Sequence, residues 1–109
     1  MQITTAQQIK DIIEPIPAEK FICSVYGDKE GNCCFLGHIH VALSPNKSYF
    51  GDDNGYGARQ LTRKFLIEKH GINTDGSDVN NYETINGYTE PVIKDRIMHL
   101  IEDMITANF

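Results

Sequence analysis

The sequence predicts an α+β fold in which a small antiparallel sheet packs against about four helices. Four stretches carry apolar residues at helical spacing, whereas one β-rich stretch, residues 21–26, is followed by turn-forming residues. The chain has 109 residues and is 40% hydrophobic, which suits a single globular domain over residues 1–109.

The first helix is predicted from a threonine followed three residues later by a glutamine, at Thr4 or Thr5, which is the pattern of a capping box. Apolar residues then recur at helical spacing up to residue 13. Pro15 disfavours helical geometry at the residue before it, so we expect this helix to end near Glu14.

A hairpin is expected next. Residues 21–26 are rich in β-branched and aromatic side chains, and residues 27–32 contain the glycine, aspartate and asparagine that reversing loops need. A short second strand would occupy residues 32–35. Residues 78–82 are candidates for one more short strand.

Residues 34–43 form an apolar run that fits either a strand or a helix. As a strand, Cys34, His38 and His40 would share one face; as a helix, Cys34 and His38 would lie one turn apart. We favour a helix over residues 33–42, although Gly37 costs it about 1 kcal/mol relative to alanine.

Two further helices have clearer signals. One spans residues 57–70 and ends at Gly71, a typical C-terminal cap. The other is predicted to start at residues 89–91, with a threonine, an acid and an early proline, and to run to the C-terminus. The apolar residues of the predicted elements should form one core: Ile9, Ile13, Phe21, Ile22, Phe35, Ile39, Phe65, Ile97, Leu100, Ile101 and Met104.

Composition narrows the partners and the compartment. The net charge of −5 argues against binding to nucleic acid or to an anionic membrane surface, since clustered Lys and Arg drive both. No apolar run is long enough to span a bilayer, and the N-terminus lacks a signal pattern, so we expect a cytoplasmic protein. Three cysteines, two of them adjacent, are expected to be free thiols.

Cys33, Cys34, His38 and His40 have the right atoms for zinc, and all four lie within eight residues. Structural zinc sites, however, usually combine two separated ligand pairs, and that spacing is absent. We therefore expect buried thiols with hydrogen-bonded histidines, and neither a metal nor another cofactor.

The same stretch offers the candidates for a cysteine enzyme. A cysteine in the first turn of a helix can have its thiolate stabilised by unpaired N–H groups, which makes Cys34, or Cys33, a possible nucleophile with His38 as its base. His70 or His99, with Asn80 or Asn81 as an orienting group, qualify by residue type alone. No family signature surrounds the cysteines, so an enzyme is not the favoured interpretation.

Positive charge is concentrated on the helix predicted at residues 57–70, where Arg59, Arg63, Lys64 and Lys69 could meet a phosphate or an acidic partner. A solvated helix face is the simpler explanation of such a charge run.

The segment Cys33-Cys34-Phe35-Leu36-Gly37-His38, then Val79-Asn80-Asn81, then residues 91–97 opening the last helix, resembles a group of small uncharacterised bacterial and phage proteins. Members of that group carry a Cys-Cys-x-x-Gly-His segment and a terminal amphipathic helix. The resemblance implies a phage or mobile-element accessory protein in a bacterial cell, and it implies no activity.

Together these observations favour a small acidic non-enzymatic protein that binds a protein partner, such as a host protein. The alternative is a cysteine-dependent enzyme or thiol-based sensor that uses Cys33 or Cys34 with a histidine. The sequence does not specify the oligomeric state.

Overall fold

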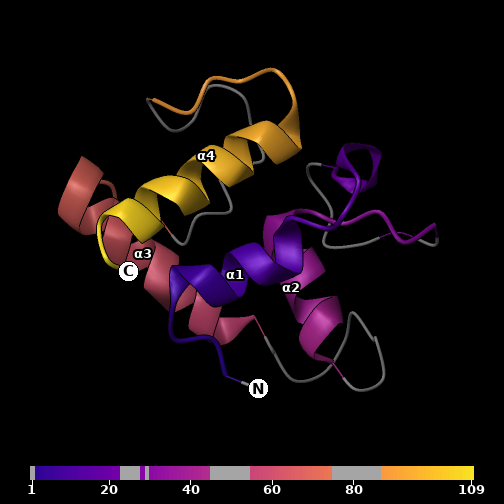
Figure 1. Cartoon of the computed structure of the whole chain (residues 1–109), viewed down its shortest axis with the longest axis horizontal. Coiled ribbons are helices and arrows are strands. Elements are labelled where there is room, and N and C mark those ends of the chain that lie inside the picture. The colour runs from indigo at the N-terminus through magenta and orange to yellow at the C-terminus, as the bar shows by residue number, and fades with distance from the viewer. Residues whose placement is uncertain (1, 23–27, 29, 45–54, 75–86) are drawn as a thin grey trace.

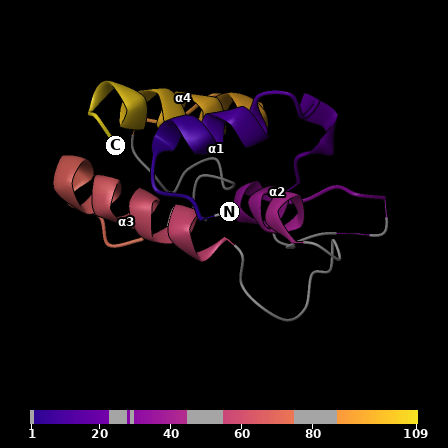
Figure 2. The same cartoon turned by 60° about the horizontal axis from the view of Figure 1, so that its bottom comes forward.

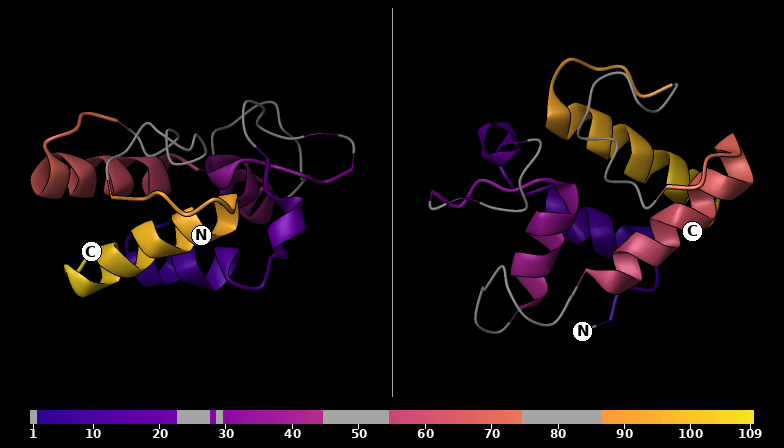
Figure 3. Two further views of the ribbon diagram at one scale, coloured as in Figure 1. Left: turned by 90° about the horizontal axis from the view of Figure 1, so that it is seen from above. Right: turned by 180° about the vertical axis from the view of Figure 1, so that it is seen from behind.

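The computed structural model describes residues 2–22, 28, 30–44, 55–74 and 87–109. Its helices are α1 (Ala6–Ile13), α2 (Phe35–Leu43), α3 (Tyr56–His70) and α4 (Ile93–Thr106), with a short 3₁₀ helix, η1 (Ala18–Lys20), after α1 (Figure 1). Helices α1 and α4 lie side by side in one layer, and α2 and α3 form a second layer beneath them (Figure 2). The same two layers are seen from above in Figure 3.

The predicted α+β class is wrong, because the described part of the chain is helical and contains no sheet. Where a hairpin was expected, the described residues contain one isolated bridge between Phe21 and Cys33, and its direction is parallel. The N–H of Ile22 donates to the carbonyl of Cys33, and the N–H of Cys33 donates to that of Lys20. Helix η1 ends at Lys20 and α2 begins directly after Cys34, which limits the extended pairing on these sides. Residues 23–27 and 29 of the expected hairpin, and the strand expected at 78–82, lie outside the described residues.

Helix α1 begins as the sequence predicts. The Thr5 hydroxyl accepts the N–H of Gln8, and the Gln8 side chain accepts the N–H of Thr5, which completes the capping box. At the other end, the Lys94 ammonium of α4 donates to the carbonyls of Glu14 and Ile16 at 2.7 and 2.6 Å. These bonds join the end of α1 to α4 within their layer.

The predicted helix over residues 33–42 is confirmed with shifted bounds, Phe35–Leu43. The prediction that a cysteine lies in its first turn is wrong. Cys34 is the N-terminal cap residue in an extended conformation, and Cys33 precedes the helix. Residues 35–40 are all buried, so this short helix presents more than one face to the rest of the protein. Such all-round burial explains the unbroken apolar run of its sequence.

Helix α3 also matches its prediction, and it ends at Gly71, which has the left-handed conformation with φ of 66°. Its first turn depends on a second glycine. A Cβ atom at Gly57 would lie 2.6 Å from the carbonyl oxygen of Ile3, so only glycine lets the N-terminal segment approach α3 this closely.

The predicted start of the last helix at residues 89–91 is wrong, because α4 begins at Ile93 with Val92 as its cap residue. The carbonyls of Glu90 and Pro91 instead accept hydrogen bonds from the buried Arg96 side chain, at 2.6 and 3.2 Å. These local bonds, to residues six and five positions earlier in the chain, hold the segment before α4 outside the helix.

The core joins all four helices, and ten of the eleven predicted core residues belong to it. Ile22 is the exception, since it is only half-buried and lies outside the cluster. Core residues that the sequence did not single out include Ile3, Leu36, Leu66 and Tyr88. Among the described residues, no helix is both long and apolar enough to cross a membrane.

Candidate functional site

The two described cysteines lie at the start of α2, and both are free thiols. The side chain of Cys33 is buried, and that of Cys34 is half-buried. Burial raises the pKa of the Cys34 thiol above its ordinary value, although hydrogen bonds from the N–H groups of Gly37 and Leu36 act in the opposite direction. Burial is the larger effect, so the protonated thiol is favoured. Cys23 lies outside the described residues.

The ring of His38 is held in place by a hydrogen bond to the backbone. Its Nε2 lies 2.7 Å from the carbonyl oxygen of Lys20, so this nitrogen carries the proton and donates it to the backbone. Its ring packs on Phe21 with the ring centres 4.5 Å apart. Burial lowers the pKa of His38 below its ordinary value, which favours the neutral ring.

The structure gives no support for a metal centre at the candidate ligands. His40 is buried on the same helix as His38, with 3% of its surface exposed. Across the described ranges, no group of three or more His, Cys, Asp and Glu side chains is placed to hold a metal ion. Asn80 and Asn81, the candidate orienting groups, lie outside those ranges.

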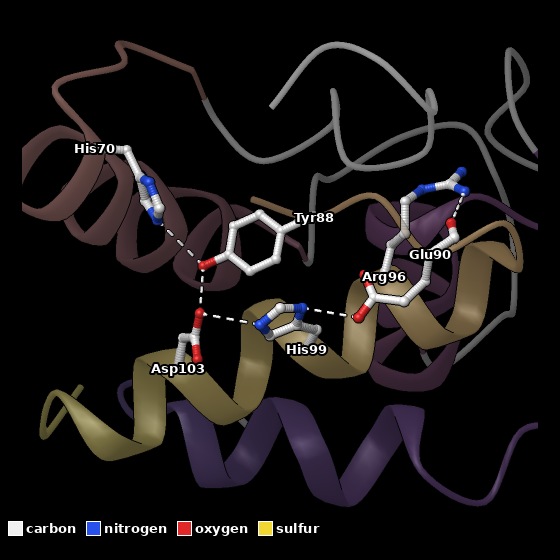
Figure 4. Close-up of polar contacts among 6 residues, drawn as sticks. All are labelled: His70, Tyr88, Glu90, Arg96, His99 and Asp103. Atoms are coloured by element: carbon white, nitrogen blue, oxygen red, sulfur yellow. Dashed lines mark hydrogen bonds and ion pairs between the residues drawn. The ribbon is translucent and has the colours of Figure 1, made fainter. Parts of the chain in front are cut away.

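A polar network between α3 and α4 was not predicted from the sequence (Figure 4). The Tyr88 hydroxyl donates to Oδ2 of Asp103 at 2.8 Å and lies 3.2 Å from Nε2 of His70. Because the single hydroxyl proton goes to Asp103, the contact with His70 requires Nε2 to be the donor. Burial and the Asp103 carboxylate together raise the pKa of Tyr88 well above its ordinary value, so the phenol stays protonated.

The network continues along α4 through His99. Its Nδ1 lies 2.8 Å from Oε2 of Glu90, and its Nε2 lies 3.6 Å from Oδ2 of Asp103. The ring of Tyr88 packs edge-on against His99, with the ring centres 4.7 Å apart. The network therefore holds the segment before α4 against the C-terminal end of α3 and one side of α4.

A surface hollow of about 280 Å³ lies beside this network. It is lined by Phe65, Lys69, His70, Asp103, Thr106 and Ala107. His70 and Asp103 are both engaged with Tyr88, so their polar atoms at the wall already take part in holding the fold. We interpret the network as a structural support for α3 and α4.

The surface with the clearest unexplained features is the outer side of α3. Its buried residues, Ala58, Thr62, Phe65 and Leu66, define the inward side. On the opposite side, at helical spacing, are Tyr56, Gln60, Arg63, Lys64 and Ile67, which we call the α3 outer face. Tyr56 and Ile67 are 59% and 47% exposed, and a hollow of about 270 Å³ is lined in part by Arg63, Lys64 and Ile67.

Comparisons with protein-family models, with curated proteins and with solved structures gave no match. The resemblance to small bacterial and phage proteins therefore stays a prediction.

Sequence reasoning recognised the basic residues of α3 but missed the polar network. Its members, His70, Tyr88, Glu90, His99 and Asp103, form no known motif, and the tertiary fold brings the first three to α4. The only local signal is the spacing of His99 and Asp103, four residues apart and therefore on one side of a helix.

Proposed function

We propose that this protein is a small non-enzymatic interaction module that binds a protein partner through the α3 outer face. The observation that carries the proposal is the exposure of Tyr56 and Ile67 on one side of α3. In line with the resemblance of the sequence, the partner is a host protein, and the module acts in the cytoplasm as a phage or mobile-element accessory factor.

Single exposed apolar residues are common on protein surfaces and need no explanation. Tyr56 and Ile67 differ because they share one side of one helix, with basic residues between them and a hollow beside Ile67. Aromatic and arginine side chains, such as Tyr56 and Arg63, are the types that contribute most to binding at protein interfaces. The arrangement has the apolar contacts and the polar surroundings of a small interface.

The cysteine chemistry favours binding over catalysis. A nucleophilic thiol needs a lowered pKa and a base that takes its proton, whereas burial raises the pKa of the Cys34 thiol and lowers the pKa of His38. Both shifts disfavour transfer of the thiol proton to the imidazole. The cysteine enzyme or thiol sensor is therefore the weaker candidate.

Site-specific photocross-linking tests the proposal. A photoreactive amino acid is placed at position 67 and, in a matched control, at position 92. Val92 is the N-cap residue of α4 and is 43% exposed, similar to Ile67. In the cells that naturally make the protein, we expect a discrete protein adduct from position 67 and none from position 92. Adducts from neither position, or equal adducts from both, would contradict the proposal.

A further inference from the structure

We propose that the segment bound by the α3 outer face is an acidic amphipathic helix of the partner, with two apolar side chains about three helical turns apart and carboxylates between them. This inference rests on the proposed protein-binding function and gives the partner's recognition segment a chemical class.

The charge distribution of the chain selects an acidic partner. Helix α3 contains four basic residues, Arg59, Arg63, Lys64 and Lys69, and one acidic residue, Glu68. The rest of the chain therefore contains six basic and fourteen acidic residues, because the whole has ten and fifteen. A positive helix on an otherwise negative protein attracts acidic segments to this helix and repels them elsewhere.

The apolar residues set the length of the partner segment. Tyr56 and Ile67 are eleven residues apart, which corresponds to about 16 Å along an α-helix. A partner helix packed along α3 would meet these residues with side chains that are themselves ten to eleven residues apart. Between them it would face Gln60, Arg63 and Lys64.

Arg63 gives a specific reason for carboxylates at the centre of the segment. Its Nε is shielded from solvent and has no hydrogen-bond partner among the described residues. A carboxylate of the partner cannot reach this shielded Nε, but it accepts a charge-assisted hydrogen bond from the terminal nitrogens of the guanidinium. Arg63 also lines the hollow beside Ile67, together with Gln60, Lys64 and Glu68, so an entering carboxylate meets two cations and one carboxylate there.

A nucleic acid fits the same surface less well. A base of a single strand would stack on Tyr56, but Ile67 offers a nucleic acid little. The phosphate chain would also extend beyond α3 over a protein whose remaining charge is strongly negative. A short acidic peptide can match both the charge and the apolar ends.

Fluorescence anisotropy with defined probes tests the inference on the full chain. The probes are labelled 18-residue helical peptides with two leucines eleven residues apart. The residues between the leucines include four glutamates, or in comparison peptides four glutamines or four lysines. A 20-nucleotide single-stranded RNA is the fourth probe. We expect the glutamate peptide to bind at least about tenfold more tightly than the glutamine peptide, with the lysine peptide and the RNA weaker still.

Three variants locate the site. Ile67→Gln should weaken binding of the glutamate peptide about tenfold, as expected for loss of an apolar anchor. The double variant Arg63→Gln with Lys64→Gln should remove the preference for the glutamate peptide over the glutamine peptide. Lys69→Gln is the control, because Lys69 adds to the charge of α3 but lies outside the α3 outer face, beside the other hollow. Loss of this long-range contribution should weaken binding by no more than about twofold. Circular dichroism verifies that each variant is folded.

Equal binding of the glutamate and glutamine peptides, absence of binding by the glutamate peptide, or tighter binding of RNA would overturn the inference. The proposed function fails separately, through the cross-linking from position 67. If position 67 gives a protein adduct while the glutamate peptide has no advantage, the protein-binding function stands and the acidic helix is wrong.

Discussion

At the scale of single residues, the burial of His38 makes the stability of the folded protein depend on pH. Its folded pKa is below the ordinary value of 6.5, so between these two values the unfolded chain binds more protons than the folded one. The stabilisation from neutral His38 is therefore fully present above about pH 6.5 and is lost as the pH falls toward the folded pKa.

Urea unfolding of the wild type and of His38→Gln between pH 7.5 and 5 measures this contribution. We expect the free energy of unfolding of the wild type to fall with acidification over this range, and the variant to lack that part of the slope. Parallel slopes for the two proteins would show that His38 does not titrate differently on folding.

The thiols give a second prediction for single residues. Because the pKa of Cys34 is raised, its thiolate fraction at neutral pH is smaller than that of an ordinary cysteine, and Cys33 is buried. We expect iodoacetamide to label both slowly at pH 7 in the native protein, with the rate at Cys34 still rising above pH 9, as mass spectrometry can follow. Fast labelling of either thiol at pH 6 would contradict this prediction and support the alternative of a cysteine-dependent enzyme.

At the scale of elements, replacing Gly57 by alanine has two opposite effects on stability, one from helix propensity and one from packing. Replacing a glycine by alanine inside a helix usually stabilises it by up to about 1 kcal/mol. At Gly57 the new Cβ would lie 2.6 Å from the carbonyl oxygen of Ile3, a backbone atom that cannot move without displacing the buried side chain of Ile3.

We therefore expect Gly57→Ala to destabilise the protein by about 1 to 3 kcal/mol, the usual cost of overpacking, in chemical denaturation. Gln60→Ala, on the outward side of the same helix, is the control and should change stability by less than about 0.5 kcal/mol. A Gly57→Ala protein more stable than wild type would contradict the close approach of the N-terminal segment.

The elements also show why the sequence predicted the helices better than the sheet. The helices were found because their apolar periodicity and caps, such as the Thr5 and Gln8 box and Gly71, are local signals. The β-rich composition of residues 21–26 is a weaker signal, because strands depend on partners that only the fold supplies. The start of α4 was misplaced for a different reason. The Arg96 side chain binds the carbonyls of Glu90 and Pro91, and neither a capping pattern nor apolar periodicity reveals such a contact.

The candidate site was predictable only in part. The charges of α3 are visible in the sequence, but the exposure of Ile67 is not, since apolar neighbours such as Leu66 in the same helix are buried. Which of two adjacent apolar residues faces solvent depends on how α3 is rotated against α1 and α2.

At the scale of the whole molecule, two isoleucines test the assignment of core and surface. Ile101 is fully buried in the core cluster, whereas Ile67 is 47% exposed. Ile101→Ala should lower the free energy of unfolding by about 2 to 5 kcal/mol, and Ile67→Ala by about 0.5 kcal/mol or less, as urea titrations would measure. Similar losses for both variants would contradict the assignment, because they would mean that α3 or α4 is rotated about its own axis and buries a different side.

The central claim is that recognition lies on the α3 outer face and that the cysteine stretch serves the fold. The most direct measurement starts from the partner identified by cross-linking from position 67. The purified partner is captured in turn by the wild type, by Ile67→Glu and by Cys34→Ser, each without a cross-linker and each verified as folded. We predict that Ile67→Glu reduces capture at least about tenfold, because it places a negative charge against an acidic partner, while Cys34→Ser retains it. Loss of capture by Cys34→Ser together with full capture by Ile67→Glu would contradict the account.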